Sequence, residues 1–571
     1  MSKASVTYCL ALVFILTTLS LTGYSFQQSE QKRKVWNVMD GNAKGDGITD
    51  DTEAIQATIK KASPGDTVLI PEGTFIVKTL GLVSGVNIKS EGILKQKLET
   101  SEEFSKTRQN SSHPLIRGKD VKDIHISINS SSQNEAIYLS GSKNIIIDHS
   151  SFLGDSTKLR SFAGLLFYKC ENITVSHSKI QNFGTDRLYT DRYQPGTGIR
   201  ILESKSITID HSEIQHNGEN GVFIHSSPGI VVRNCNISYN GMSGIQLAFG
   251  NRGLEKNYHF INNTLNFNSG DAIDINNHAS KSPLPIHSLI QNNQSKGNGY
   301  VSGASTPDGS GIATLVNVSN VEVYHNIASQ NNRPAIYLEG CGKIRLTGNT
   351  ADNQVEIVGK LEDLSLKKNE FANITFIDNV HAERIYLDEN RMNTIHLPNG
   401  IKIDSLLLSK NIFNNAALNF NLSGNLRLVE NKINCSGKDP AILLVKANNA
   451  FLENNEIFSQ QSIGIVVRKM AQNVEIINNT IQARNTCITD DGSPNLLIQK
   501  NKLTALQAGA YHQTLRSKNP ENLRLANNEH TGKLDSPVLI LEGNGTAFLE
   551  SEKIISGKTN FGQVKVTKKN F

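Results

Sequence analysis

An asparagine recurs at nearly fixed intervals through the second half of this 571-residue chain. Asn349, Asn369, Asn390 and Asn411 are separated by 20, 21 and 21 residues, and each follows a short aliphatic segment. A period of this kind, built from strands of about 3–5 residues with polar corners, is typical of a solenoid whose coils bury their apolar faces only against neighbouring coils. A β-propeller or a β-sandwich explains neither the short period nor the single Asn in each turn. The sequence therefore predicts an all-β chain folded as a parallel β-helix.

Earlier segments align on the same corner, although the residue there is more varied. The corner positions are Ser150, Ser178, Ser212, Cys235, Asn263, Asn293, Asn326, Asn349, Asn369, Asn390, Asn411, Asn431, Asn455, Asn479, Asn501 and Asn528. Asn suits a corner because it tolerates left-handed backbone angles, and its amide can bond to the Asn of the next coil. Strand side chains alternate, so we expect Val222 and Ile224 to point inward and Phe223 and His225 outward.

A short helix is expected near the start of the mature chain. Residues 50–62 (DDTEAIQATIKKA) carry apolar residues at helical spacing, and Asp50 with Glu53 three residues later resembles a capping box. A solenoid exposes an apolar cross-section at its ends unless another element covers it. We therefore predict that this helix caps the first coil.

The residues around this helix resemble a known family. Residues 36–56 (WNVMDGNAKGDGITDDTEAIQ) and 65–75 (GDTVLIPEGTF) are similar to the N-terminal cap of the pectate-lyase superfamily, which includes rhamnogalacturonases, polygalacturonase-like hydrolases, alginate lyases and mannuronan C5-epimerases. The resemblance implies a right-handed parallel β-helix with a short N-terminal capping helix. It also implies action on a polysaccharide, although the same cap occurs in phage tailspikes.

Two shorter stretches resemble enzymes of that superfamily without their complete motifs. Residues 240–246 (NGMSGIQ), followed by 251–255 (NRGLE), are similar to a stretch of mannuronan C5-epimerase modules, but the Tyr-Gly-Phe-Asp-Pro-His motif of those enzymes is absent. Residues 270–272 (GDA) carry one acid where polygalacturonases carry a pair, and no Gly-His-Gly follows. The resemblance therefore leaves the reaction type open.

The N-terminus predicts export. Residues 1–25 combine a positive start, the apolar run 8–21 and small polar residues, which is the order of a secretory signal peptide. The run is shorter than the ~20 residues that a membrane-spanning helix needs, so we expect a secreted or periplasmic protein without a membrane span. A net charge of +5 is too weak to favour nucleic acid as a partner. The odd number of scattered cysteines after residue 25 predicts buried thiols, not disulfides or a zinc site.

Coil length divides the chain into regions. The corner spacing is 34 residues between Ser178 and Ser212, and it is 28, 30 and 33 residues over the three coils from 235 to 326. Extra residues in a solenoid leave as loops, often on the binding side. The predicted organisation is a signal peptide at 1–25, an N-terminal cap at 26–80 and a β-helix at 81–571, with groove-bearing coils at 136–340, plain coils at 345–530 and a C-terminal cap at 531–571.

Outward side chains of successive strands are expected to form columns along the groove. One predicted column is Tyr138, Leu166, Arg200, Phe223, Gln246, Asp274, Ala313 and Tyr337, and its neighbour is Ser140, Tyr168, Leu202, His225, Ala248, Asn276, Leu315 and Glu339. Parallel strands lie about 4.8 Å apart, so the polar members of both columns would share one patch. Further candidates in or beside the loops are Arg187, Tyr189, Arg192, Tyr193, Arg252, Lys256 and Asp271.

This patch contains the groups needed to act on a uronic-acid polymer. Proton abstraction at C5 requires a cation that neutralises the substrate carboxylate, such as Arg200 or Lys256, and a base such as His225 or Tyr189. Elimination then gives a lyase, and reprotonation from the opposite face gives an epimerase. The scarcity of tryptophan also favours a charged substrate over a neutral one. The leading prediction is a lyase acting on an acidic polysaccharide such as alginate or pectin.

The remaining candidates contribute binding or alternative chemistry. The predicted substrate contacts are Gln246, Asn276, Arg187, Arg192, Tyr193, Arg252 and Tyr168. Asp274, grouped with the catalytic candidates, could with Asp271 bind Ca²⁺, whose oxygen ligands bridge acidic sugars. The same two residues could instead serve as the acid and base of a glycoside hydrolase of the polygalacturonase type. A non-catalytic glycan-binding β-helix is the third class of function.

Overall fold

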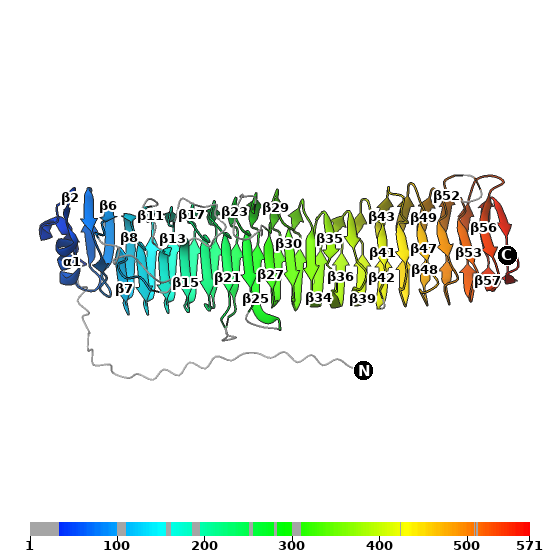
Figure 1. Cartoon of the computed structure of the whole chain (residues 1–571), viewed down its shortest axis with the longest axis horizontal. Helices are drawn as coiled ribbons and strands as arrows, with labels where there is room; N and C mark the ends of the chain where they lie inside the picture. The colour runs from blue at the N-terminus through cyan, green and yellow to red at the C-terminus, as the bar shows by residue number, and fades with distance from the viewer. Residues whose placement is uncertain are drawn as a thin grey trace, which may run out of the picture.

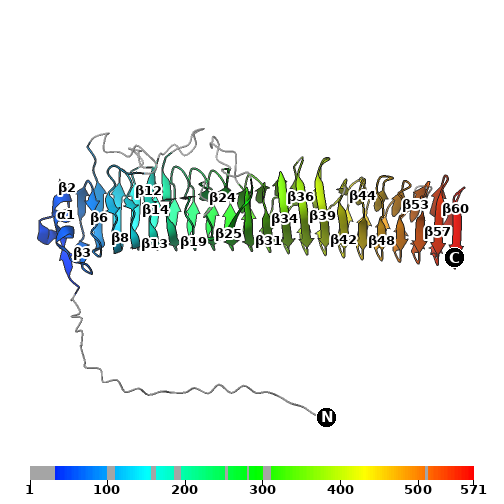
Figure 2. The ribbon, with the colours of Figure 1, turned by 90° about the horizontal axis from the view of Figure 1, so that it is seen from below.

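The computed structural model describes residues 33–99, 110–155, 162–184, 195–250, 255–278, 282–299, 310–377, 379–422, 424–507, 509 and 512–570. These residues form a parallel β-helix whose coils stack along one long axis, with α1 (Thr52–Lys61) at one end and β60 (Lys565–Lys569) at the other (Figures 1 and 2). The predicted all-β architecture is confirmed. The predicted signal peptide lies outside the described residues. The part of the chain that the structure describes contains no helix with the length and hydrophobicity needed to cross a bilayer.

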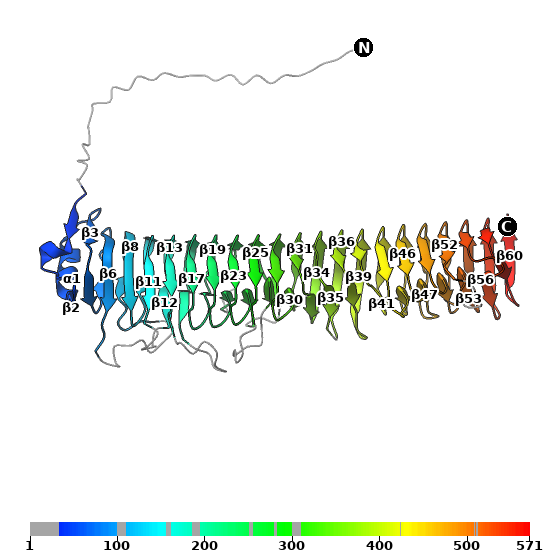
Figure 3. The ribbon, with the colours of Figure 1, turned by 90° about the horizontal axis from the view of Figure 1, so that it is seen from above.

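A typical coil contains three strands. One coil consists of β15 (Thr197–Leu202), β16 (Lys205–Asp210) and β17 (Glu213–Gln215). They pair in parallel with β18 (Val222–His225), β19 (Ile230–Arg233) and β20 (Asn236–Ser238) of the next coil. Figure 3 shows the three resulting series of strands running the length of the molecule.

One of these series forms the face that bears the predicted columns. Among the described residues it is a 13-stranded sheet of β5 (Leu80–Gly81), β7 (Ile116–Lys119), β9 (Ile137–Ser140), β12 (Ala163–Tyr168), β15, β18, β21 (Ile245–Ala248), β24 (Ile273–Asn276), β27 (Ala313–Val316), β30 (Ile336–Glu339), β33 (Val355–Val358), β35 (Asn373–Phe376) and β38 (Thr394–His396). A 7-stranded sheet follows, made of β41 (Leu418–Phe420), β44 (Ile442–Leu444), β47 (Ile465–Val467), β50 (Ile488–Asp490), β53 (Leu515–Lys518), β56 (Pro537–Glu542) and β59 (Lys558–Asn560).

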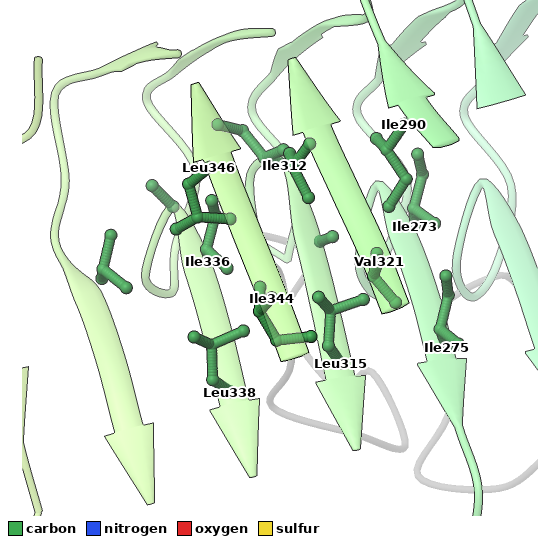
Figure 4. Packing of buried hydrophobic residues seen from close by; sticks show 14 of the residues in the cluster. Ile273, Ile275, Ile290, Ile312, Leu315, Val321, Ile336, Leu338, Ile344 and Leu346 are labelled. Carbon is green, nitrogen blue, oxygen red and sulfur yellow. The ribbon is translucent and has the colours of Figure 1, made fainter. Parts of the chain in front are cut away.

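The interior of the coil is an aliphatic core that runs the length of the stack. Inward side chains of β27 and β30 face those of β28 (Val318–Tyr324) and β31 (Lys343–Thr347), as Leu315 and Ile344 illustrate (Figure 4). Val222 and Ile224 are fully buried in this core, whereas Phe223 and His225 are partly exposed, which confirms the predicted alternation. The five cysteines in the described ranges are free and buried, as expected.

The corner asparagines form a continuous ladder through the late coils. Asn390 donates from Nδ2 to Asn411 Oδ1 at 3.0 Å and to the Leu366 carbonyl at 2.9 Å. Its own Oδ1 accepts from the Nδ2 and the backbone N–H of Asn369, both at 2.9 Å. Every polar atom of the buried amide is therefore satisfied, and the predicted ladder is confirmed.

The prediction that Asn occupies this corner because it tolerates left-handed backbone angles is wrong. The left-handed backbone angle belongs to the residue before the ladder position, as Lys368, Glu389 and Lys410 show with φ of 55°, 55° and 54°. The ladder residue itself points into the coil and is almost fully buried. Asn is therefore selected by its buried amide bonds, and the preceding exposed residue takes the left-handed conformation.

A second ladder, which sequence alignment missed, occupies another corner of the early coils. Asn217, Asn240, Asn268 and Asn298 donate from Nδ2 to the Oδ1 of the next member, ending at Asn331, over distances of 2.9–3.2 Å. It precedes the strands of the 13-stranded sheet and therefore holds their starting points in register.

The helix at the N-terminal end begins one residue later than the capping-box pattern implies. Its N-cap is Asp51, whose carboxylate accepts from the backbone N–H groups of Lys44 and Gly45 at 2.6 and 3.0 Å and makes no cap bond to the helix. Asp50 Oδ1 accepts from the Thr52 N–H at 3.0 Å. Ile55 and Ile59 are buried in the common core.

Candidate functional site

The strand register brings the predicted polar column together. Cα partners run from Arg200 to Phe223, from Phe223 to Gln246 and from Gln246 to Asp274 through β15, β18, β21 and β24. The neighbouring column likewise aligns His225 with Ala248 and Ala248 with Asn276. The predicted alignment of these four strands is confirmed.

The alignment is wrong by one residue at β27. Asp274 pairs with Thr314, and Asn276 with Val316, in place of the predicted Ala313 and Leu315. Residues 312–316 (IATLV) are apolar at nearly every position, so the alternation there does not distinguish the two faces. The column therefore continues through Thr314 to Tyr337, and a hydroxyl group lies where an alanine was expected.

Arg200 is not an open cation on the groove. Its side chain is 4% exposed, and its Nη1 lies 2.9 Å from Glu219 Oε2 and 2.7 Å from Thr197 Oγ1. The guanidinium group also stacks on the Phe223 ring at 4.2 Å. A buried charge needs such a partner, and Glu219 already supplies it. In this arrangement the Arg200 guanidinium group is buried and paired within the groove face. It is not available to bind a substrate carboxylate.

Gln246 links two buried polar side chains. Its Nε2 donates to Asp274 Oδ2 at 2.9 Å, and its Oε1 accepts from Asn220 Nδ2 at 2.9 Å. Asn220 is fully buried, and its Oδ1 accepts the Ser243 N–H at 3.0 Å. The orientation of the Asp274 carboxyl group is therefore set by a chain of bonds that extends back over two coils.

A cavity of about 250 Å³ opens beside Asp274. It is lined by Asp271, Asp274, Asn276, His278, Ser310, Thr314, Val316, Arg333, Pro334, Tyr337 and Glu339. These residues come from β24, β27 and β30 and from the segments that precede or follow them. Three carboxyl groups and one phenol therefore face a single hollow, together with one arginine and one histidine.

Tyr337 and Glu339 form a hydrogen-bonded pair in this cavity. The Tyr337 hydroxyl donates to Glu339 Oε2 at 2.9 Å. Burial, reinforced by the Glu339 carboxylate, raises the pKa of Tyr337 above its usual range. Tyr337 therefore remains a hydrogen-bond donor at neutral pH. Both residues stood in the predicted columns, but neither was assigned a role in the site.

Asp271 has a structural bond as well as a place in the cavity. It is 2% exposed, and its Oδ1 accepts the Ser310 N–H at 2.6 Å. Its own N–H donates to Ser243 Oγ at 3.2 Å, in the same bonding pattern that links Ser243 to Asn220. Asp271 and Asp274 share the cavity, with the Asn276 amide beside them, so oxygen ligands of the type that Ca²⁺ prefers are present. Calcium binding there stays a prediction.

His225 meets the electrostatic requirement for a base. It is half-buried, and burial lowers its pKa, outweighing the opposite effects of Glu255 and Glu203. The imidazole is therefore neutral at neutral pH. Lys256 is exposed, and Tyr168 is partly buried two coils before His225 in the same column. Arg187, Tyr189, Arg192, Tyr193 and Arg252 lie outside the described residues, and their roles stay predictions.

Comparison with known proteins supports the architecture. A family profile described as "Right handed beta helix region" matches residues 109–295, which include most of this groove face. The match supports a right-handed parallel β-helix over these residues.

One curated protein is similar to part of this chain. "Plasmin and fibronectin-binding protein A" of Streptococcus pneumoniae (strain ATCC BAA-255 / R6) is 28% identical over 173 residues, which is 21% of this chain and 24% of that protein. The chain thus spans about a quarter of the length of that curated relative.

Solved structures similar to this β-helix include enzymes and a phage protein. The A-module of Azotobacter vinelandii mannuronan C-5 epimerase AlgE6 is 13% identical, with a TM-score of 0.24 over 93% of this chain and 99% of that one. The Yersinia enterocolitica family 28 exopolygalacturonase is 12% identical, with a TM-score of 0.28 over 88% and 79%. The tailspike receptor-binding domain of siphovirus 9NA is 11% identical, with a TM-score of 0.38 over 65% and 76%. At these TM-scores the likenesses carry no argument about chemistry.

Sequence reasoning missed the partners that decide what the predicted residues can do. Glu219 lies in a polar stretch (HNGEN) that looks like a solvated turn, yet it is 1% exposed. No local pattern indicates that it pairs with Arg200. Glu339 and Tyr337 could have been predicted as site residues, because both lie in the predicted outward columns that also contain Asp274 and Asn276.

Proposed function

We propose that this protein is a carbohydrate-active enzyme that hydrolyses glycosidic bonds in the cavity between β24, β27 and β30. The observation that carries the proposal is the convergence of Asp271, Asp274 and Glu339 on one hollow of about 250 Å³. Glycoside hydrolysis most commonly uses two carboxyl groups, one as proton donor and the other as base or nucleophile.

The two leading carboxyl groups have different surroundings, as an acid and a base require. Asp274 is 9% exposed and is oriented by Gln246, whereas Glu339 accepts a hydrogen bond from the Tyr337 hydroxyl at 2.9 Å. Both carboxyl groups accept a hydrogen bond from a neutral donor, so the difference between them is burial, which penalises a charged group. Asp274 is the more buried of the two, and we therefore assign proton donation to Asp274 and the base or nucleophile role to Glu339.

Elimination from a uronate, which the sequence favoured, has less support from the geometry. That reaction needs a cation against the substrate carboxylate. Arg200 is engaged with Glu219, and among the described residues that line the cavity three carboxyl groups accompany a single arginine, Arg333. The neutral imidazole of His225 keeps the lyase as the second candidate, because it supplies a suitable base.

An assay against a panel of acidic and neutral polysaccharides separates the two reactions. Hydrolysis releases reducing ends without the absorbance of an unsaturated uronate, whereas elimination produces both. We expect reducing ends alone, and we expect Asp274→Asn and Glu339→Gln to abolish them. Glu322→Gln is the matched control, because Glu322 lies in β28 on a different sheet of neighbouring coils. Loss of activity in His225→Ala together with unsaturated products would overturn the proposal in favour of the lyase.

A non-catalytic glycan-binding role is the remaining outcome of the same experiment. In that case the panel gives no products, and binding to an immobilised polysaccharide survives both Asp274→Asn and Glu339→Gln. Folding of each variant is checked by its thermal unfolding transition.

A further inference from the structure

We propose that Asp148, His149 and His177 form a binding site for one divalent transition-metal ion, on a different corner of the coil from the groove cavity. Among the described residues, this is the group of three His, Cys, Asp or Glu side chains whose ligand atoms all lie within 4.8 Å of one another. It involves none of the residues that line the cavity beside Asp274.

The fold places the two imidazoles in adjacent coils at the same position. His149 follows β10 (Lys143–Asp148) and His177 follows β13 (Glu171–Ser176), and these strands pair in parallel with Asp148 opposite Ser176. Both histidines occupy the left-handed corner, with φ of 45° and 46°. Their rings stack with centroids 4.8 Å apart and planes 9° apart. The corner therefore delivers two histidine ligands at the spacing of one coil.

The Asp148 carboxylate bridges the two rings. Its Oδ2 lies 2.8 Å from His149 Nδ1, and its Oδ1 lies 3.2 Å from His177 Nδ1. In a tetrahedral zinc site with bonds of about 2.0–2.1 Å, donor atoms lie about 3.3 Å apart. The observed separations are of that order, and an ion could replace the protons between nitrogen and oxygen if the two stacked rings turn toward each other.

The ion can reach this position from solvent. The side chains of His149, His177 and Asp148 are 70%, 51% and 22% exposed. Water can therefore complete the coordination.

The donor set selects the class of metal. Imidazole nitrogen suits Zn²⁺, Ni²⁺ and Cu²⁺, whereas Ca²⁺ and Mg²⁺ prefer sites made of oxygen ligands alone. Two imidazoles with one carboxylate therefore favour a transition metal over calcium.

The next coil extends the histidine stack but not the metal site. His211 stacks on His177 with centroids 5.2 Å apart, and its Nδ1 lies 2.7 Å from Asp210. Asp210 already receives Arg233 Nη2 at 2.8 Å and Asn234 Nδ2 at 3.0 Å. Because Arg233 neutralises this carboxylate, the site is confined to the first two coils.

Zinc titration by calorimetry on the protein without a polyhistidine tag tests the proposal. We expect one Zn²⁺ to bind at neutral pH, and we expect His177→Asn and Asp148→Asn to weaken binding by about tenfold or more, since even indirect partners of a metal site contribute about 10–100-fold. Asn preserves the fold at this corner, because Asn234 and Asn262 take the same left-handed conformation in later coils.

His325→Asn is the matched control. His325 has φ of 51° at the same corner, and it belongs to no metal-type cluster among the described residues. Its substitution should leave zinc affinity unchanged. Absence of zinc binding, or equal affinity in the His177→Asn variant, would overturn the proposal. Zinc binding that survives Asp274→Asn would show that this site is independent of the proposed activity.

Discussion

The early coils that carry the cavity differ from the late coils in how their buried charged groups are arranged. Around Asn390 the corner consists of identical amides that satisfy one another, and the buried acids Asp388 and Asp490 lie far apart in the chain. In the early coils Arg200, Glu219, Asp271 and Asp274 are all buried, although the same core and the same parallel pairing hold those coils together. Buried charged groups thus occur in both regions, but in the early coils four of them lie on neighbouring coils and two of these line the cavity, which a site on the groove explains.

The largest expected effect compares one buried acid from each region. Asp274→Asn should lower glycan hydrolysis by about 10²–10⁴-fold, the usual contribution of a general acid. Asp490→Asn removes a buried acid from β50, in the sheet that follows the groove sheet, and should leave the rate unchanged. Steady-state assays of glycan hydrolysis by both variants test this prediction. An equal loss of activity in the two variants would contradict the distinction between the two regions.

The next effect concerns the stability of the early coils. Glu219→Gln leaves the Arg200 charge without its anionic partner, and breaking a buried pair costs about 3–5 kcal/mol in free energy of unfolding. Asp363→Asn removes an exposed carboxylate from the Arg384 pair at 3.0 Å and should cost less than about 1 kcal/mol. Hydrogen exchange of the amides in β15 and β18 measures the first effect locally. An unchanged exchange rate there would contradict the assignment of Glu219 as the essential partner.

A third substitution probes the ladder of the late coils. Asn390→Ala leaves the Leu366 carbonyl and the Asn369 amide without their partner, at about 1–3 kcal/mol for each unsatisfied group. Because each coil contacts mainly its neighbours, the loss should be confined to adjacent coils in hydrogen exchange. Asn415→Ala, at an exposed position in the same region, serves as the control.

The smallest effect is a pH dependence in the late coils. Burial raises the pKa of Asp490 to about 6 from 3.8, despite hydrogen bonds from Ser517, Ser493 and Gly492. A folded-state pKa above the unfolded value means that stability from this group is present below pH 4 and is lost as the pH rises through about 6. Asp490→Asn should remove that fall, so that the free energy of unfolding of the variant no longer decreases between about pH 4 and pH 6. Denaturant titrations at several pH values test this prediction. If a cation neutralised Asp490, the free energy of unfolding would instead rise with pH over this range.

Much of the architecture could be predicted from local pattern. The Asn period indicated the stacked coils, and the alternation in β18 assigned Val222 and Ile224 to the core. The same alternation aligned Arg200, Gln246 and Asp274 correctly across β15, β21 and β24. It failed at β27, where both faces are apolar and Ala313 was placed one step out of register.

The sequence by itself determined the solenoid and the outward direction of its polar columns, because strand alternation and coil period are properties of neighbouring residues. Only the tertiary structure decided that Arg200 is neutralised by Glu219, that Tyr337 and Glu339 close the cavity of Asp274, and that His149 meets His177. These pairings join residues about 20 or more positions apart, or in different coils, and their geometry depends on the path of the intervening chain. The local sequence pattern does not encode the path of the intervening chain. The fold can therefore be predicted from the sequence repeat, whereas the contacts between the functional side chains depend on how the coils stack.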